Sequence, residues 1–153
     1  ISAIVKFFSD SNYLVLAGYI AEYDEKLKEC LLITPTLEYI KYTYGNPIDC
    51  YRALCACNFI PAPGMAYKRE LINRYGMYDE EYKLVEDYPR WLYLIRNGCC
   101  IGFLSRFIVK YRNGGISFNR DENIDKIYND DLALVKEKEI LPYVNIIKDI
   151  NYK

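Results

Sequence analysis

Two adjacent acidic residues, Glu86 and Asp87, stand directly before the apolar stripe of a predicted helix. At this position the start of the helix can influence the charge and direction of a carboxylate. Tyr88 and Pro89 begin that helix, because proline is tolerated in a first turn whose N–H groups have no helical partner. A carboxylate there faces unpaired backbone N–H groups and the positive end of the helix dipole. We therefore expect an acid with a fixed direction and a low pKa. The spacing alone favours an ordinary helix cap and does not reveal a catalyst.

Composition removes several kinds of chemistry. The 153 residues contain no histidine, which excludes Ser-His-Asp triads, Cys-His dyads and histidine zinc sites. Basic and acidic residues number 20 and 21, so no positive excess supports binding to nucleic acid. No apolar run approaches the roughly 20 residues that span a bilayer. The length and a hydrophobic share of 52% indicate one globular domain, residues 1–153.

Tyrosine and cysteine are the residue types that stand out. Tyrosine occurs 17 times, which suits a carbohydrate or peptide cleft or reflects simple compositional bias. The six cysteines include C-x-C and C-C pairs, which suit neither a disulfide framework nor a C-x-x-C zinc site. We interpret them as reduced, mostly buried thiols of a cytosolic protein.

The elements that must position Glu86 and Asp87 follow from hydrophobic periodicity and turn residues. The prolines and glycine of 61–64 predict an extended loop, Asn113-Gly114-Gly115 predicts a flexible turn, and 36–45 is ambiguous. The alternation indicates an α/β fold with a mixed sheet flanked by helices. Helices are expected at 2–9, 50–57, 68–75, 85–98 and 127–139, and strands at 13–23, 31–34, 65–67, 99–104 and 107–111.

The stretch from Ile60 to Ser117 carries an ordered set of short motifs. A proline-glycine loop is followed by a short basic helix and by Gly-Met-Tyr-Asp-Glu. Glu-Asp then precedes a Trp-Leu helix, and two strands lead to Tyr-Arg and a Gly-Ile-Ser turn. In this order the stretch resembles the C-terminal, acceptor-side half of family-2 glycosyltransferases with the GT-A fold. The resemblance implies a partial GT-A, Rossmann-like fold.

The resemblance also implies roles around the acidic pair. Asp87 matches the catalytic base, which takes the proton of the acceptor hydroxyl in an inverting transfer, and Glu86 would orient Asp87 or touch the acceptor. Trp91 would form a floor under the acceptor sugar or, alternatively, pack in the core. Pro63 and Gly64 match a loop that lines the cleft between donor and acceptor.

A second group of implied residues follows the last predicted strand. Arg112, Gly114 and Gly115 match a mobile loop near the diphosphate, where a guanidinium suits phosphate oxygens. The alternative for Arg112 is an ordinary surface salt bridge. Family members often carry histidine in this loop, whereas this chain has Asn113 and Gly114.

The metal motif of the family has no match here. Relatives hold Mg²⁺ or Mn²⁺ with Asp-x-Asp, and the nearest approach is Glu22-Tyr23-Asp24, which we interpret as a turn. We therefore expect a fragment without the N-terminal nucleotide-binding half, inactive in isolation. The bared sheet predicts self-association as a homodimer.

The intact protein implied by the resemblance is a bacterial cell-envelope enzyme of polysaccharide biosynthesis. It would use a nucleotide-sugar donor, a divalent metal, and a glycan or glycolipid acceptor, in the cytoplasm or peripheral to the inner face of the membrane. Two alternatives stay open. One is a non-catalytic carbohydrate-binding or assembly domain derived from the same fold, and the other is an unrelated α/β domain.

Overall fold

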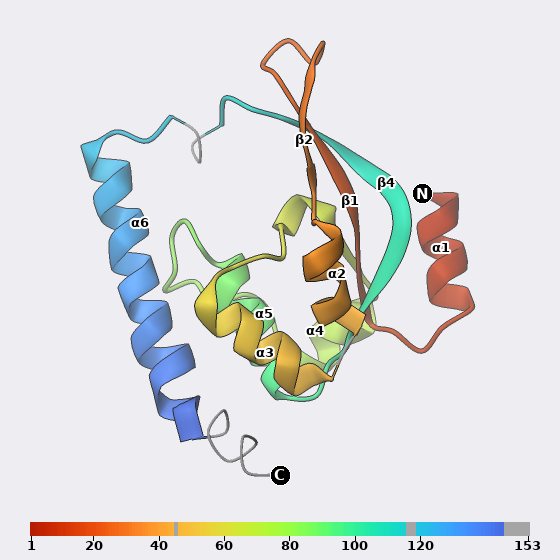
Figure 1. The fold of residues 1–153 in the computed structure, drawn as a ribbon. Coiled ribbons are helices and arrows are strands. Elements are labelled where there is room, and N and C mark those ends of the chain that lie inside the picture. Colours follow the sequence, from red (N-terminus) through yellow and green to blue (C-terminus); the bar gives the residue numbers. More distant parts are fainter. Residues whose placement is uncertain (45, 116–118, 146–153) are drawn as a thin grey trace.

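The computed structural model describes residues 1–44, 46–115 and 119–145. Within these ranges a mixed four-stranded sheet is flanked by helices, which confirms the α/β expectation (Figure 1). The helices are α1 (Ser2–Ser9), α2 (Leu37–Tyr44), α3 (Pro47–Ala56), α4 (Arg69–Tyr75), α5 (Asp87–Arg96) and α6 (Glu122–Val135), and the strands are β1 (Val15–Tyr23), β2 (Cys30–Thr34), β3 (Met65–Tyr67) and β4 (Ile101–Arg112).

Strand β1 is the centre of the sheet. β4 runs parallel to it along its whole length, from Val15 opposite Ile101 to Tyr23 opposite Arg112. β2 and β3 are antiparallel to β1 and pair with different halves of it, at residues 20–23 and 15–17. Because a strand has only two edges, β2 and β3 share the edge that β4 leaves free.

The sequence predicts two strands where the structure has one. β4 continues through Ser105 and Arg106, which form a bulge: Leu104 lies opposite Gly18, and Phe107 lies opposite Tyr19. The bulge absorbs the polar residues without ending the strand. A Cβ on Gly18 would lie 2.9 Å from the side chain of Ile108, so glycine lets the two strands pass closely here.

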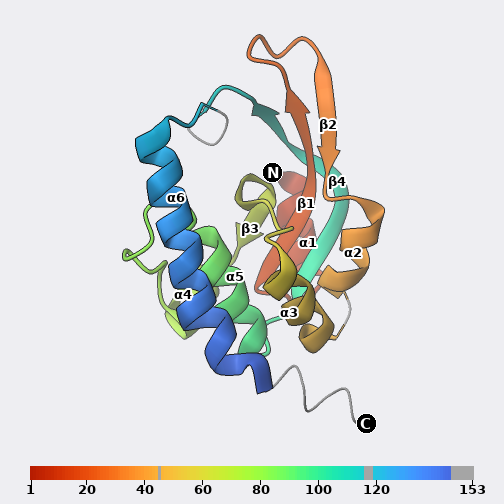
Figure 2. The same ribbon diagram turned by 60° about the vertical axis from the view of Figure 1, so that its left-hand side comes forward.

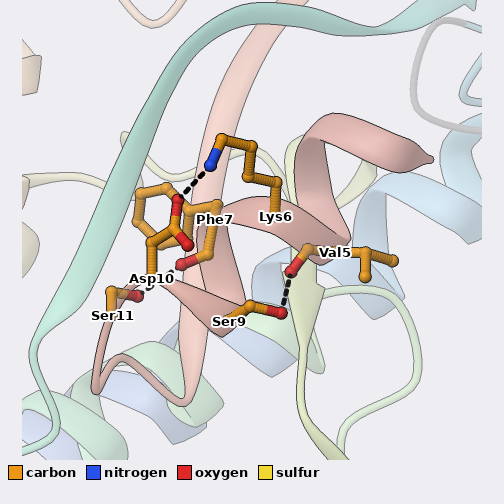
Figure 3. A network of polar contacts seen from close by, with 6 residues as sticks. All are labelled: Val5, Lys6, Phe7, Ser9, Asp10 and Ser11. Carbon is orange, nitrogen blue, oxygen red and sulfur yellow. Dashed lines mark hydrogen bonds and ion pairs between the residues drawn. The ribbon is translucent and has the colours of Figure 1, made fainter.

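Helices cover both faces of the sheet. Helix α1 lies on one face, where a Cβ on Gly102 would come within 2.6 Å of the ring of Phe7. Local contacts close the end of α1: Lys6 pairs with Asp10 at 2.7 Å, and the Ser11 hydroxyl donates to the carbonyl of Phe7 at 2.8 Å (Figure 3). Helices α3 and α5 cover the other face, and α6 lies outside α5 (Figure 2).

Several tyrosines serve the packed interior, and Tyr51, Tyr82 and Tyr88 are buried. The Tyr88 hydroxyl donates to the carbonyl of Leu54, and the Tyr51 hydroxyl donates to the carbonyl of Glu139 at 2.5 Å. Burial raises the pKa of both phenols to about 12, so they stay protonated donors. These bonds tie α3 to α5 and to the turn after α6. The tyrosine surplus is thus explained in part by core structure.

The structure decides one segment that the sequence left ambiguous and corrects two local predictions. Residues 36–45 form helix α2 as far as Tyr44, with residue 45 outside the described ranges, and the 61–64 loop contains a 3₁₀ turn at Ala62–Gly64. Proline's fixed φ suits such a turn. Helix α6 begins at Glu122 and not near Ile127, because Asp121 caps it by accepting from the N–H of Ile124 at 2.9 Å. The chain then continues as a π turn, Lys136–Ile140, and a 3₁₀ turn, Leu141–Tyr143.

The cysteines are free, as expected, but fewer are buried than predicted. Cys50 and Cys99 are buried, whereas Cys30, Cys57 and Cys100 are exposed and Cys55 is intermediate. Burial raises the pKa of the Cys50 thiol to about 12 and that of Cys99 to about 11. These two thiols therefore behave as small apolar side chains.

Candidate functional site

The acidic pair stands at the beginning of α5, as the sequence predicts. Asp87 is the first residue of the helix, and Glu86 precedes it with φ −56° and ψ −22°. The Glu86 side chain is exposed and makes no capping hydrogen bond. Glu86 therefore does not cap the helix with its carboxylate, and Asp87 lies within the first turn, half-buried.

The Asp87 carboxylate is held from two sides. The side-chain amide of Asn58 donates to its two oxygens at 3.3 and 3.4 Å, and the backbone N–H groups of Tyr88 and Ala62 also point at it. The Asn58 carbonyl oxygen in turn accepts from the N–H of Ile60 at 3.3 Å, which orients the amide. Asn58 follows α3, 29 residues before Asp87, and sequence reasoning did not identify it. The only feature of the sequence that could have identified Asn58 is its position as a polar residue directly before the apolar 59–64 loop.

The expectation of a low pKa for Asp87 is wrong. Burial raises the pKa of its carboxyl group and outweighs the hydrogen bond from Asn58, and the nearby charge of Glu86 raises it further. The N–H groups of Tyr88 and Ala62 lower the pKa without reversing the balance. Desolvation penalises the charged form, so this carboxylate is a stronger base than an exposed aspartate.

The proline-glycine loop lies beside Asp87. Its turn, Ala62–Gly64, is closed by the N–H of Gly64 donating to the carbonyl of Pro61 at 3.0 Å. A Cβ on Gly64 would lie 2.8 Å from the Ile20 side chain and 3.1 Å from the carbonyl of Gly18, so only glycine lets the turn approach β1 this closely. Pro63 is exposed. The structure thus brings together Asp87, Asn58 and the predicted Pro63-Gly64 loop.

Trp91 takes the alternative role of a core residue. Only 1% of it is exposed, and its indole N–H donates to the carbonyl of Ile60 at 3.1 Å. A ring this enclosed has no face open to a sugar. Trp91 instead anchors the loop that carries Asn58 and the Ala62–Gly64 turn, one turn of helix beyond Asp87.

The second predicted group lies at a different place, the turn end of the β1–β2 hairpin, where residues 24–29 join the two strands. Arg112 is the last residue of β4, and the N–H of Asn113 donates to the carbonyl of Tyr23 at 2.9 Å. Gly114 has a φ of +106°, and a Cβ there would lie 3.1 Å from the Glu25 side chain.

Arg112, Gly114 and Gly115 are all exposed. Within the described ranges no ion pair involves Arg112, and no hydrogen bond joins it to Asp87. The salt-bridge alternative therefore finds no support there. Residues 116 and 117 of the Gly-Ile-Ser turn lie outside the described residues.

Asp24 forms the turn that the sequence predicts. Its carboxylate accepts from the N–H groups of Lys28 at 2.6 Å and Glu29 at 3.0 Å, and these backbone hydrogen bonds, that of Glu29 first, lower its pKa. No group of three or more His, Cys, Asp or Glu side chains in the part of the chain that the structure describes is placed to hold a metal ion. No such cluster among the described residues marks a place for the Mg²⁺ or Mn²⁺ that the glycosyltransferase resemblance implies.

Comparison with known proteins adds no information about this site. No family model, curated protein or solved structure was found to match the chain. Among the helices described, none has both the length and the apolar character to cross a membrane.

Proposed function

We propose that the chain is the acceptor-side half of an inverting glycosyltransferase similar to family 2, with a partial GT-A fold. Such an enzyme transfers a sugar from a nucleotide-sugar to a polysaccharide or lipid-linked acceptor. The observation that carries the proposal is Asp87: a half-buried carboxylate of raised pKa on the first turn of α5, beside the Ala62–Gly64 turn. The resemblance of the ordered motifs from Ile60 to Ser117 supports the family named in this proposal.

Asp87 acts as the general base in this proposal. It accepts the proton of the acceptor hydroxyl as that oxygen attacks the anomeric carbon, while the nucleotide diphosphate leaves from the opposite face. The Asn58 amide and the rigid helix start keep the carboxylate directed, which is what a positioned base requires. Glu86, exposed beside it, contributes the negative field that strengthens the base and is free to accept hydrogen bonds from acceptor hydroxyls.

The donor side depends on groups beyond the described residues. A divalent cation bound there would neutralise charge on the diphosphate leaving group. Arg112, Gly114 and Gly115 are this chain's own contribution, because an exposed guanidinium next to a glycine turn can approach phosphate oxygens. The proposal includes an inactive isolated chain, a homodimer, and an enzyme of bacterial envelope synthesis at the inner face of the membrane.

The decisive experiment replaces Asp87 in the full-length enzyme, assayed with donor, acceptor and divalent metal. Asp87→Asn should reduce kcat by about 10²-fold or more, because a general base is removed with little change in shape. Asp79→Asn is the matched control, since Asp79 is an exposed acid in the loop before α5 and should leave the rate unchanged. A near-normal rate for Asp87→Asn would remove Asp87 from the role of base.

The non-catalytic carbohydrate-binding domain is the competing outcome. It requires glycan binding by a wild-type protein that transfers no sugar under any donor and metal combination. Titration of the chain with acceptor glycans, followed by tyrosine and tryptophan fluorescence, tests it. Binding that survives Asp87→Asn unchanged, together with absent transfer, favours this alternative over the enzyme.

A further inference from the structure

A second aspartate, Asp131 of α6, is buried at the back of the segment that leads into α5. Only 5% of it is exposed. One of its carboxylate oxygens accepts from three consecutive backbone N–H groups, those of Lys83 at 2.8 Å, Leu84 at 2.7 Å and Val85 at 3.3 Å. Successive N–H groups that converge on one anion form a nest, which orders the backbone that supplies them.

This nest adjoins the acidic pair directly. Glu86 and Asp87 follow Val85 in the chain, and the carbonyl of Val85 accepts from the N–H of Tyr88 at 3.0 Å. Val85 is itself buried, with 5% of its surface exposed. The backbone that Asp131 holds therefore sets where α5 begins, and with it where the Asp87 side chain leaves the helix.

We propose that Asp131 is a positioning residue for Asp87, acting through the backbone of residues 83–85. Its significance for sugar transfer rests on the proposed function, whereas the positioning itself does not. Helix α6 thereby serves the site from the outside of α5 (Figure 2). A second tie, the ion pair of Lys138 with Glu81, joins the same loop to the π turn after α6 but is solvent-exposed, and exposed pairs contribute little.

The physical consequence of losing the nest is hydration of Asp87. Without the Asp131 oxygen, three N–H groups in a partly buried segment have no acceptor, and the segment gains by opening to water. Water that enters there reduces the burial of Asp87, which is the main cause of its raised pKa. The pKa of Asp87 should then fall toward the ordinary value of about 3.9.

The test is a pH titration of the Asp87 carboxyl carbon by ¹³C NMR in the 153-residue chain. Asp131→Ala and Asp131→Asn remove the same charge, but only the asparagine keeps an oxygen able to accept the three N–H groups. We expect the Asp87 midpoint to fall in Asp131→Ala and to fall less in Asp131→Asn. Asp130→Asn, a change at the exposed neighbour on α6, should leave the midpoint unchanged.

The proposal is overturned if Asp131→Ala folds and Asp87 titrates as in the wild type. If Asp131→Ala does not fold, Asp131→Asn decides: faster amide exchange at 83–85 with an unchanged Asp87 midpoint overturns the proposal, and a lowered midpoint supports it. The titration needs neither donor nor acceptor. A lowered midpoint combined with normal sugar transfer by Asp87→Asn would therefore refute the proposed function and leave the positioning intact.

Discussion

The start of α5 and the end of the β1–β2 hairpin each present an aspartate beside a turn, in opposite electrostatic states. Asp24 at the hairpin accepts short backbone hydrogen bonds of 2.6 and 3.0 Å, which outweigh its partial burial and lower its pKa. Asp87 at the helix start has longer side-chain contacts of 3.3 and 3.4 Å, is half-buried, and has a raised pKa. The first carboxylate is committed to closing its turn. The carboxylate of Asp87 has a raised pKa and is therefore the stronger base of the two.

The aromatic residues of the two regions differ in the same way. Trp91 on α5 is 1% exposed and hydrogen-bonded to the loop beside Asp87, whereas Phe107 on β4 is 59% exposed. The helix start is therefore supported by a rigid interior, whereas Phe107, which follows the bulge in β4, is open to solvent. Rigid support suits a base that must be aimed, and exposure suits groups that meet a partner or ligand.

The largest expected effect is on stability, when an aromatic residue of each region is replaced by alanine. Trp91→Ala should lower the free energy of unfolding by about 3–5 kcal/mol, because it empties a packed core and removes the bond to Ile60. Phe107→Ala should cost about 1 kcal/mol or less, since Phe107 is 59% exposed and its ring pairs with that of Tyr19. Urea unfolding measures both. Equal losses of unfolding free energy in the two variants would mean that the two regions are equally well packed, contrary to this prediction.

Local patterns predicted most elements near Asp87, whereas the contacts that define its chemistry come from distant residues. Helix α1 has its predicted bounds, and the start of α5 lies at the acidic pair, because spacing and proline placement are local signals. The bulge in β4 was missed because it depends on the register with β1. The pKa of Asp87 was misjudged because its burial comes from tertiary packing.

The supporting residues were invisible for the same reason. Asn58 is 29 positions from Asp87, and Asp131 is 48 positions from Lys83, so no local spacing links them. Trp91 shows the converse: its helical spacing was compatible with the core and with a sugar platform, and only its exposed fraction of 1% separates them. Residue types thus identified the acid, and the packing determined how strong a base it is.

A smaller effect distinguishes the two glycines at the hairpin end. Gly114→Ala should destabilise the chain by about 1 kcal/mol or more, because its φ of +106° and the nearby Glu25 side chain both resist a Cβ. Gly115→Ala is the matched control, since nothing lies within 4 Å of a Cβ there. Thermal unfolding of the two variants gives the comparison. If both lose the same stability, the turn has no special backbone requirement at Gly114.

The smallest expected effect is the pH dependence of stability, which has opposite signs for Asp24 and Asp87. The lowered pKa of Asp24 stabilises the fold above its unfolded-state pKa of about 3.9, and that contribution is lost as pH falls through the folded pKa. The raised pKa of Asp87 favours folding of the protonated form. Its contribution is complete below the unfolded-state pKa and is lost as pH rises through the folded value.

Replacing each aspartate by asparagine therefore has opposite pH signatures. Relative to the wild type, Asp24→Asn should become less stable as pH rises from about 3 to 7, and Asp87→Asn should become more stable over the same range. Chemical denaturation at both ends of the range measures each difference, with Asp130→Asn as an exposed control. Parallel pH trends for the two variants would show that burial does not raise the pKa of Asp87, and a carboxylate without a raised pKa has no enhanced basicity to offer an acceptor hydroxyl.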